Sequence, residues 1–225
     1  MRLPVLAAAL IGLALIASPA AAKKKVPLVP PPAPIDMTID QDPARDPENV
    51  LVLDLSNGGR VAIRLKPQWA PAHIERIKTL AGQGFYNGVI FHRVIEGFMA
   101  QTGDPTGTGQ GGSPLPDLKA EFNNVPHLRG TVAMARTNEP DTANSQFFVM
   151  FYPRFALDNK YTNFGRVIAG MDHVDAIVRG EPPQTPTKIV QASLASENKP
   201  RPDIAAAPVV VAAPSVNELN ASNSN

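Results

Sequence analysis

One short stretch of this sequence combines a fixed positive charge with aromatic, thioether and amide side chains. Its chemistry-bearing members are Arg93, Phe98, Met99 and Gln101. A guanidinium is charged at any working pH and offers N–H donors in a planar fork, so it can stabilise an electron-rich atom. If residues 89–95 form a strand and the chain turns back at Gly97, Arg93 stands over a floor formed by Phe98 and Met99. Periodicity alone favours a plainer interpretation, an amphipathic hairpin with an arginine on its surface.

Other residues that often do chemistry lack the sequence context that such chemistry needs. The chain contains no cysteine, which excludes disulfides, thiolate nucleophiles and thiolate metal sites. Residues 107–112 satisfy the dinucleotide pattern G-x-G-x-x-G, but neither a preceding strand nor a following helix is predicted, so we expect a flexible loop. The four histidines are scattered, and Ser145 has no G-x-S-x-G frame. We therefore predict no metal ion, no cofactor and no serine hydrolase.

The charges of the chain argue against a nucleic-acid partner. The sequence holds 21 Lys and Arg against 20 Asp and Glu. Cleavage of a signal peptide over residues 1–22 would remove Arg2 and leave equal numbers of basic and acidic residues. A nucleic-acid binder needs a concentrated basic face to neutralise phosphates, and the sequence shows none.

The N-terminus has the pattern of a cleavable signal peptide. Arg2 precedes an apolar run over residues 5–16, and the three alanines at 20–22 fit the small-x-small rule for signal peptidase. The run has about a dozen residues, fewer than the ~20 that a membrane-spanning helix needs. We therefore predict cleavage after Ala22, export to the periplasm or the medium, and no stable membrane insertion.

Composition divides the rest of the chain into one globular domain between two low-complexity flanks. Prolines crowd residues 23–47, which predicts an extended linker. Residues 196–225 contain prolines, no aromatic residue and an Asn/Ser-rich end, which predicts a disordered tail. Residues 48–195 can bury a core of their own. No coiled-coil pattern or surplus apolar helix is evident, so we expect a monomer.

The periodicity of the domain is mostly that of β-strands. The runs expected to form strands are 50–55, 61–65, 89–95, 98–101, 131–135, 146–151, 163–168 and 187–194. Two further segments have helical spacing, one between Pro71 and Gly82 and one over residues 174–178. Closure of the sheet would remove its exposed strand edges. We therefore predict a mainly β fold, a closed eight-stranded antiparallel β-barrel capped by two α-helices.

Several motifs in this domain are similar to those of the cyclophilin family of peptidyl-prolyl cis/trans isomerases, including its exported bacterial members. The longest are F-H-R-x-x-x-G-F-M-x-Q-x-G-D at residues 91–104 and N-S-Q-F-F at residues 144–148. The shorter matches, in family order, are Gly107-Thr108-Gly109, Met134-Ala135, Leu157-Asp158 and Phe164-Gly165. The resemblance implies an eight-stranded barrel capped by two helices, and an isomerase that needs no cofactor.

The resemblance also implies roles for individual residues. Arg93 would be the catalytic guanidinium, assisted by Phe98, and Gln101 would hydrogen-bond the substrate backbone. The pocket for the proline ring would be lined by Phe98, Met99, Phe148, Leu157 and Tyr161. The groove for the residues before proline would be bordered by Gly107, Ala135, Arg136, Thr137 and Gln146. The implied partners are proline-containing, unfolded or loop segments of exported proteins.

The chain departs from the common family pattern at several positions. Arg136 and Thr137 stand where Asn and Ala are frequent, so we expect a more polar and cationic groove. Ala156 occupies the position of a common Trp, and Tyr161 that of a common pocket His, so strong cyclosporin binding is not expected. The leading hypothesis is an exported isomerase that assists folding. The alternative, supported only by these departures, is a proline-peptide binding module or holdase chaperone with little turnover.

Overall fold

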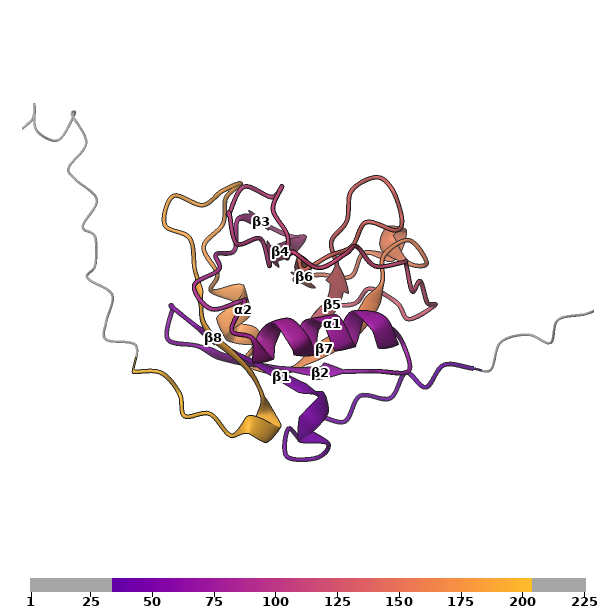
Figure 1. The fold of residues 1–225 in the computed structure, drawn as a ribbon, viewed down its shortest axis with the longest axis horizontal. Coiled ribbons are helices and arrows are strands. Elements are labelled where there is room, and N and C mark those ends of the chain that lie inside the picture. The colour runs from indigo at the N-terminus through magenta and orange to yellow at the C-terminus, as the bar shows by residue number, and fades with distance from the viewer. Residues whose placement is uncertain (1–33, 204–225) are drawn as a thin grey trace, which may run out of the picture. The chain divides into compact units, whose positions relative to one another are not determined.

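The computed structural model of the protein describes residues 34–203, in which one curled antiparallel sheet is accompanied by two α-helices (Figure 1). The strands are β1 Val50–Leu55, β2 Arg60–Leu65, β3 Arg93–Ile95, β4 Met99–Thr102, β5 Thr131–Met134, β6 Phe147–Met150, β7 Asn163–Ala169 and β8 Ile189–Leu194. Their order in the sheet is β3-β4-β6-β5-β7-β2-β1-β8. All eight predicted strands are present, although β3 begins at Arg93 rather than at residue 89.

The seam between the edge strands β3 and β8 is closed by isolated bridges rather than by a continuous ladder. Ile90, just before β3, pairs with Lys188, just before β8. Val94 of β3 pairs in the same way with Gly180. These bridges satisfy backbone groups that an open sheet edge would leave unpaired. The predicted mainly β, eight-stranded antiparallel fold with two helices is confirmed, and the edges of the curled sheet meet through such local backbone contacts instead of a continuous ladder.

Helix α1, Pro71–Gly82, forms where the sequence predicts it and packs against β8. It begins with a proline, whose missing N–H and fixed φ suit the first helical turn. Its apolar stripe, Ile74, Ile77 and Leu80, is fully buried. Among residues 34–203, no helix is both long enough and apolar enough to cross a membrane.

Helix α2, Met171–Asp175, packs against β2 and is shorter than its apolar pattern predicts. Ile177 and Val178 were expected to continue its stripe, but both lie beyond its end. The side chain of Arg179 donates from Nη1 to the carbonyls of Asp175 at 2.5 Å and Ile177 at 2.6 Å. In a longer helix, backbone N–H groups of the next turn would donate to these carbonyls. Here the guanidinium of Arg179 donates to them instead.

Alternation along the strands separates two hydrophobic clusters on opposite faces of the sheet. The smaller cluster has a buried centre of Met99, Ala133, Phe148 and Met150. The larger cluster contains three alternate apolar residues from each of β1 and β2, the stripe of α1, and Phe147. Because successive strand residues point to opposite faces, the adjacent residues Phe147 and Phe148 enter different clusters. The face of the smaller cluster carries the candidate site.

Both flanks contact the domain beyond the limits expected from composition. The Arg64 guanidinium, on β2, is almost fully buried and donates to carbonyl oxygens of the preceding segment between Asp40 and Asp46. On the other side, Gln191 of β8 donates from Nε2 to the carbonyl of Pro200 at 3.1 Å. The domain ends of the linker and of the tail are therefore hydrogen-bonded to the sheet. The predicted signal peptide, the start of the linker and the end of the tail lie outside the described residues.

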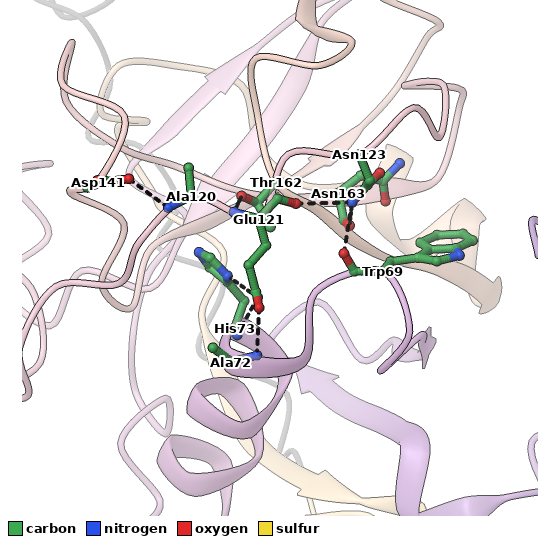
Figure 2. A network of polar contacts seen from close by, with 9 residues as sticks. All are labelled: Trp69, Ala72, His73, Ala120, Glu121, Asn123, Asp141, Thr162 and Asn163. Carbon is green, nitrogen blue, oxygen red and sulfur yellow. Dashed lines mark hydrogen bonds and ion pairs between the residues drawn. The ribbon is translucent and has the colours of Figure 1, made fainter. Parts of the chain in front are cut away.

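A polar network fastens the first turn of α1 to a distant loop (Figure 2). The Glu121 carboxylate accepts hydrogen bonds from the backbone N–H groups of Ala72 and His73, each at 3.1 Å, and lies 2.6 Å from Nδ1 of His73. Free N–H groups at a helix start favour negative charge there. Burial lowers the pKa of His73 below its ordinary value, against the opposing influence of Glu121. The neighbouring Ala120 N–H donates to Asp141, which extends the network toward the segment before β6.

Candidate active site

The register of three strands places Arg93, Gln101 and Phe148 in one row across the sheet. Arg93 of β3 pairs with Gln101 of β4, and Gln101 pairs with Phe148 of β6. Directly paired residues present their side chains on the same face, and Met99, two residues from Gln101, shares it. The sheet therefore brings together the guanidinium, amide, aromatic and thioether groups noted in the sequence.

A cavity of about 220 Å³ lies beside this row. It is lined by Arg93, Phe98, Met99, Gln101, Ala135, Arg136, Phe148, Leu157 and Tyr161. The ring of Phe148 is 5% exposed and meets the ring of Tyr161 edge-on, with 5.8 Å between their centroids. The aromatic and thioether lining suits a small apolar ring, whereas the side chain of Arg93, 41% exposed, supplies a charged donor accessible to solvent.

A second, more polar cavity of about 610 Å³ adjoins the first and shares three lining residues with it. The shared residues are Gln101, Ala135 and Arg136. Gln101 donates from Nε2 to Oε1 of Gln146 at 2.8 Å. Gln146 in turn donates to the carbonyls of Gly109 at 3.1 Å and Gly111 at 2.8 Å. The two glutamine amides are thereby positioned against the glycine-rich loop.

Asp104 organises the glycine-rich loop from inside. Its fully buried carboxylate accepts hydrogen bonds from the N–H groups of Thr106 at 2.7 Å, Gly109 at 2.6 Å and Gly111 at 3.0 Å. Burial opposes ionisation, but hydrogen bonds from Thr106 and the two glycines outweigh it and lower the pKa of Asp104 to about 2. Residues 107–112 form the loop that the sequence predicts, wrapped around a carboxylate.

Asp104→Asn should destabilise the protein at neutral pH by about 2 kcal/mol, because the N–H groups of Thr106, Gly109 and Gly111 lose an ionised acceptor. The folded-state pKa lies below the ordinary value of 3.8, so the unfolded chain binds the proton more readily. This contribution is therefore present above about pH 4 and is lost as the pH falls toward 2. Urea denaturation at pH 7 and pH 3 should give a smaller difference between wild type and variant at the lower pH. Equal differences at both pH values would contradict a role for the charge.

Arg136 lies between the two cavities and is held by stacking and by backbone acceptors. Its guanidinium stands 4.5 Å from the centre of the Tyr161 ring. It donates from Nη2 to the carbonyl of Lys160 and from Nη1 to that of Thr137, each at 2.8 Å. The junction of the cavities therefore carries a fixed positive charge, in line with the expectation of a more cationic groove.

The structure brings together all but one of the site residues predicted from the sequence. Arg93, Phe98, Met99, Gln101, Ala135, Arg136, Thr137, Gln146, Phe148, Leu157 and Tyr161 each line at least one of the two cavities. Gly107 lines neither. It adopts a positive φ of 70°, and a Cβ added there would lie 2.9 Å from Cδ1 of Ile90. This glycine therefore permits a turn packed on Ile90.

Two charged residues of the site were not predicted. Nε of Arg93 donates to Oε2 of Glu181 at 2.8 Å, across 88 residues of sequence. The guanidinium of Arg154 stands 5.2 Å from the centre of the Phe98 ring. No local spacing links either pair, so only the tertiary structure reveals them.

The fold and the site define a class of small proteins built on a curled antiparallel sheet, with two adjoining cavities and a guanidinium beside aromatic and thioether side chains. A family model described as "Cyclophilin type peptidyl-prolyl cis-trans isomerase/CLD" matches residues 50–194. The chain belongs to this family, so the resemblance seen in its motifs is confirmed. It is a peptidyl-prolyl cis-trans isomerase of the cyclophilin type, a family that works without a cofactor.

Individual relatives agree with this assignment. A "Probable peptidyl-prolyl cis-trans isomerase" of Brucella suis is 46% identical over 172 residues, covering 69% of this chain and 87% of the relative. "Peptidyl-prolyl cis-trans isomerase-like 1" of Aspergillus fumigatus is 46% identical over 125 residues, covering 54% and 76%.

Solved structures are similar as well. Cyclophilin AquaCyp293 from Hirschia baltica gives a TM-score of 0.63 at 30% identity, covering 69% of this chain and 77% of that one. A cyclophilin-type isomerase of Cryptosporidium parvum, crystallised in the presence of the dipeptide Ala-Pro, gives 0.61 at 26% identity, covering 64% and 98%. Both relatives share the fold on which the candidate site is built.

Proposed function

We propose that this protein is an exported isomerase that accelerates rotation about X-Pro bonds in exported proteins and so assists their folding. The observation that carries the proposal is the place of Arg93, which lines a cavity of about 220 Å³ together with aromatic and thioether side chains, in the same row as Gln101 and Phe148. The similar Cryptosporidium parvum isomerase was crystallised with the dipeptide Ala-Pro, which supports a proline-containing substrate. The proposed partners are unfolded or loop segments of exported proteins.

The proposed reaction is rotation about an amide bond, which makes and breaks no covalent bond. It must disrupt amide resonance against a barrier of ~18–20 kcal/mol. In the twisted transition state the prolyl nitrogen becomes pyramidal and regains a lone pair. Arg93 donates a hydrogen bond to that lone pair, and its charge persists at any working pH. A lysine at this position would lack the planar fork.

Arg93 supplies only part of the required acceleration. A barrier of about 20 kcal/mol gives roughly one event per minute, so a rate of ~10³ per second requires a barrier about 6–7 kcal/mol lower. One charge-assisted hydrogen bond contributes only ~1.5–3 kcal/mol. The rest comes from holding the proline ring against Phe98, Met99 and Phe148 while Gln101 binds the substrate backbone, so that rotation is the favoured motion.

The proposed activity is tested by measuring proline isomerisation with purified residues 23–225. NMR exchange spectroscopy on an Ala-Pro peptide reports the rotation directly and avoids a coupled protease. We expect exchange far faster than in peptide alone. Peptide binding without faster exchange would reject the enzyme and favour a proline-peptide binding module or holdase chaperone.

The proposed export rests on the sequence pattern of the N-terminus. The chain is expressed in a bacterium with its own N-terminus and recovered from periplasmic, cytoplasmic and membrane fractions. Mass spectrometry should find Lys23 as the first residue of a periplasmic product, and light scattering should give the mass of one chain. A membrane-bound product that retains Met1 would contradict cleavage and export.

A further inference from the structure

The Arg93 guanidinium is held on one edge by a carboxylate from a distant loop. Nε of Arg93 donates to Oε2 of Glu181 at 2.8 Å. Among residues 34–203, Glu181 is the only hydrogen-bond partner of the Arg93 side chain, so Nη1 and Nη2 remain available. Glu181 lines neither of the two cavities, although its carboxylate contacts an arginine that lines the smaller one.

The backbone fixes the loop that carries Glu181. The preceding residue, Gly180, exchanges two hydrogen bonds with Val94, the neighbour of Arg93, at 2.8 and 2.9 Å. Gly180 has a φ of 144°, and a Cβ there would lie 2.5 Å from Cα of Pro183. Only a glycine therefore allows the chain to turn this closely, and Pro183 on the far side of the turn is buried. Glu181 is thus brought to Arg93 by backbone pairing.

We propose that Glu181 is a positioning residue for the isomerase reaction, a role that rests on the proposed function of Arg93. The carboxylate fixes the Nε edge of the guanidinium and leaves the two terminal nitrogens for the substrate. An unpaired arginine on a surface samples many rotamers, and it loses this conformational entropy when it orders against a substrate. If the side chain is already ordered before the substrate binds, the reaction barrier does not include that entropy loss. Because both partners are about half exposed, the pair contributes little to folding stability.

The first test separates turnover from substrate binding in Glu181→Ala and Glu181→Gln. NMR exchange on the Ala-Pro peptide over a range of concentrations gives kcat and KM. We expect kcat to fall about fivefold to tenfold in Glu181→Ala, with KM changed less than about twofold. Glu181→Gln, which keeps an acceptor oxygen without the charge, should lie between that variant and wild type. The matched control is Glu96→Ala, which breaks the similar 2.8 Å pair with Arg179 and should leave kcat unchanged.

The second test asks whether Glu181 acts through Arg93. In a double-mutant cycle, Glu181→Ala should have no further effect on kcat in an Arg93→Ala background. The NMR signal of the Arg93 Nε–H should exchange slowly with water in wild type and rapidly in Glu181→Ala. Unchanged kcat together with an unchanged Nε–H signal would overturn the proposal. A wild type without turnover would instead reject the proposed function, and the Nε–H signal would still decide whether Glu181 holds Arg93.

Discussion

Arg93→Ala should lower the rate of Ala-Pro peptide isomerisation about 100-fold while changing the free energy of unfolding by less than about 0.5 kcal/mol. A charge-assisted hydrogen bond contributes about 1.5–3 kcal/mol, and each 1.36 kcal/mol of barrier corresponds to a tenfold change in rate. The apolar pocket remains in the variant, so part of the acceleration should persist. Stability should hold because the side chain is 41% exposed and pairs with a carboxylate that is itself exposed. NMR exchange and a thermal melt measure the two quantities.

Two further variants sharpen this result. Arg93→Lys keeps a positive charge without the planar fork, so its rate should lie between those of Arg93→Ala and wild type. Arg129→Ala removes a similarly exposed arginine, which pairs with Asp175 away from both cavities, and should leave the rate unchanged. If the Arg93→Ala protein were unfolded, Arg93 would be needed for stability and not specifically for catalysis. If the variant were fully active, Arg93 would not be needed for isomerisation.

Phe147→Ala should lower the free energy of unfolding by about 3–5 kcal/mol. The ring is fully buried in the larger cluster, where it packs edge-on against Tyr86 at 5.6 Å and Phe164 at 6.2 Å between centroids. Its removal leaves a cavity that these neighbours can only partly fill. A loss of this size is a large fraction of the ~5–15 kcal/mol that stabilises a typical domain. Urea denaturation followed by circular dichroism gives the value.

The controls for Phe147→Ala use two other phenylalanines. Phe155, 64% exposed, should be replaceable by alanine within about 0.5 kcal/mol. Phe148→Ala, on the opposite face, should weaken Ala-Pro peptide binding because this ring lines the smaller cavity. If Phe147→Ala weakened peptide binding while stability stayed at the wild-type value, the assignment of the two faces would be wrong.

Most of the secondary structure, and most of the residues that line the candidate site, could be predicted from local patterns of residue types. Short β-prone apolar runs, with alternation clearest over residues 61–65, predicted the strands, because strands favour β-branched and aromatic residues bounded by turn residues. Pro71 and the glycines after the apolar stripe predicted α1 by local backbone chemistry. The turn expected at Gly97 predicted the hairpin that places Phe98 and Met99 close to Arg93, and the pairing of β3 with β4 confirms that hairpin. The motifs around Arg93 and Phe148 then indicated the family.

Only the tertiary structure decided how distant segments meet. Glu181 reaches Arg93 across 88 residues because Gly180 bridges to Val94 at the seam of the sheet, and no local pattern encodes that pairing. Beyond the end of α2, the side chain of Arg179 likewise donates to the carbonyls of Asp175 and Ile177, contacts that the apolar pattern does not predict. Periodicity reports which face of an element is buried, whereas long-range register depends on closure of the whole sheet. The contacts that orient the arginine therefore appear only once the sheet is assembled.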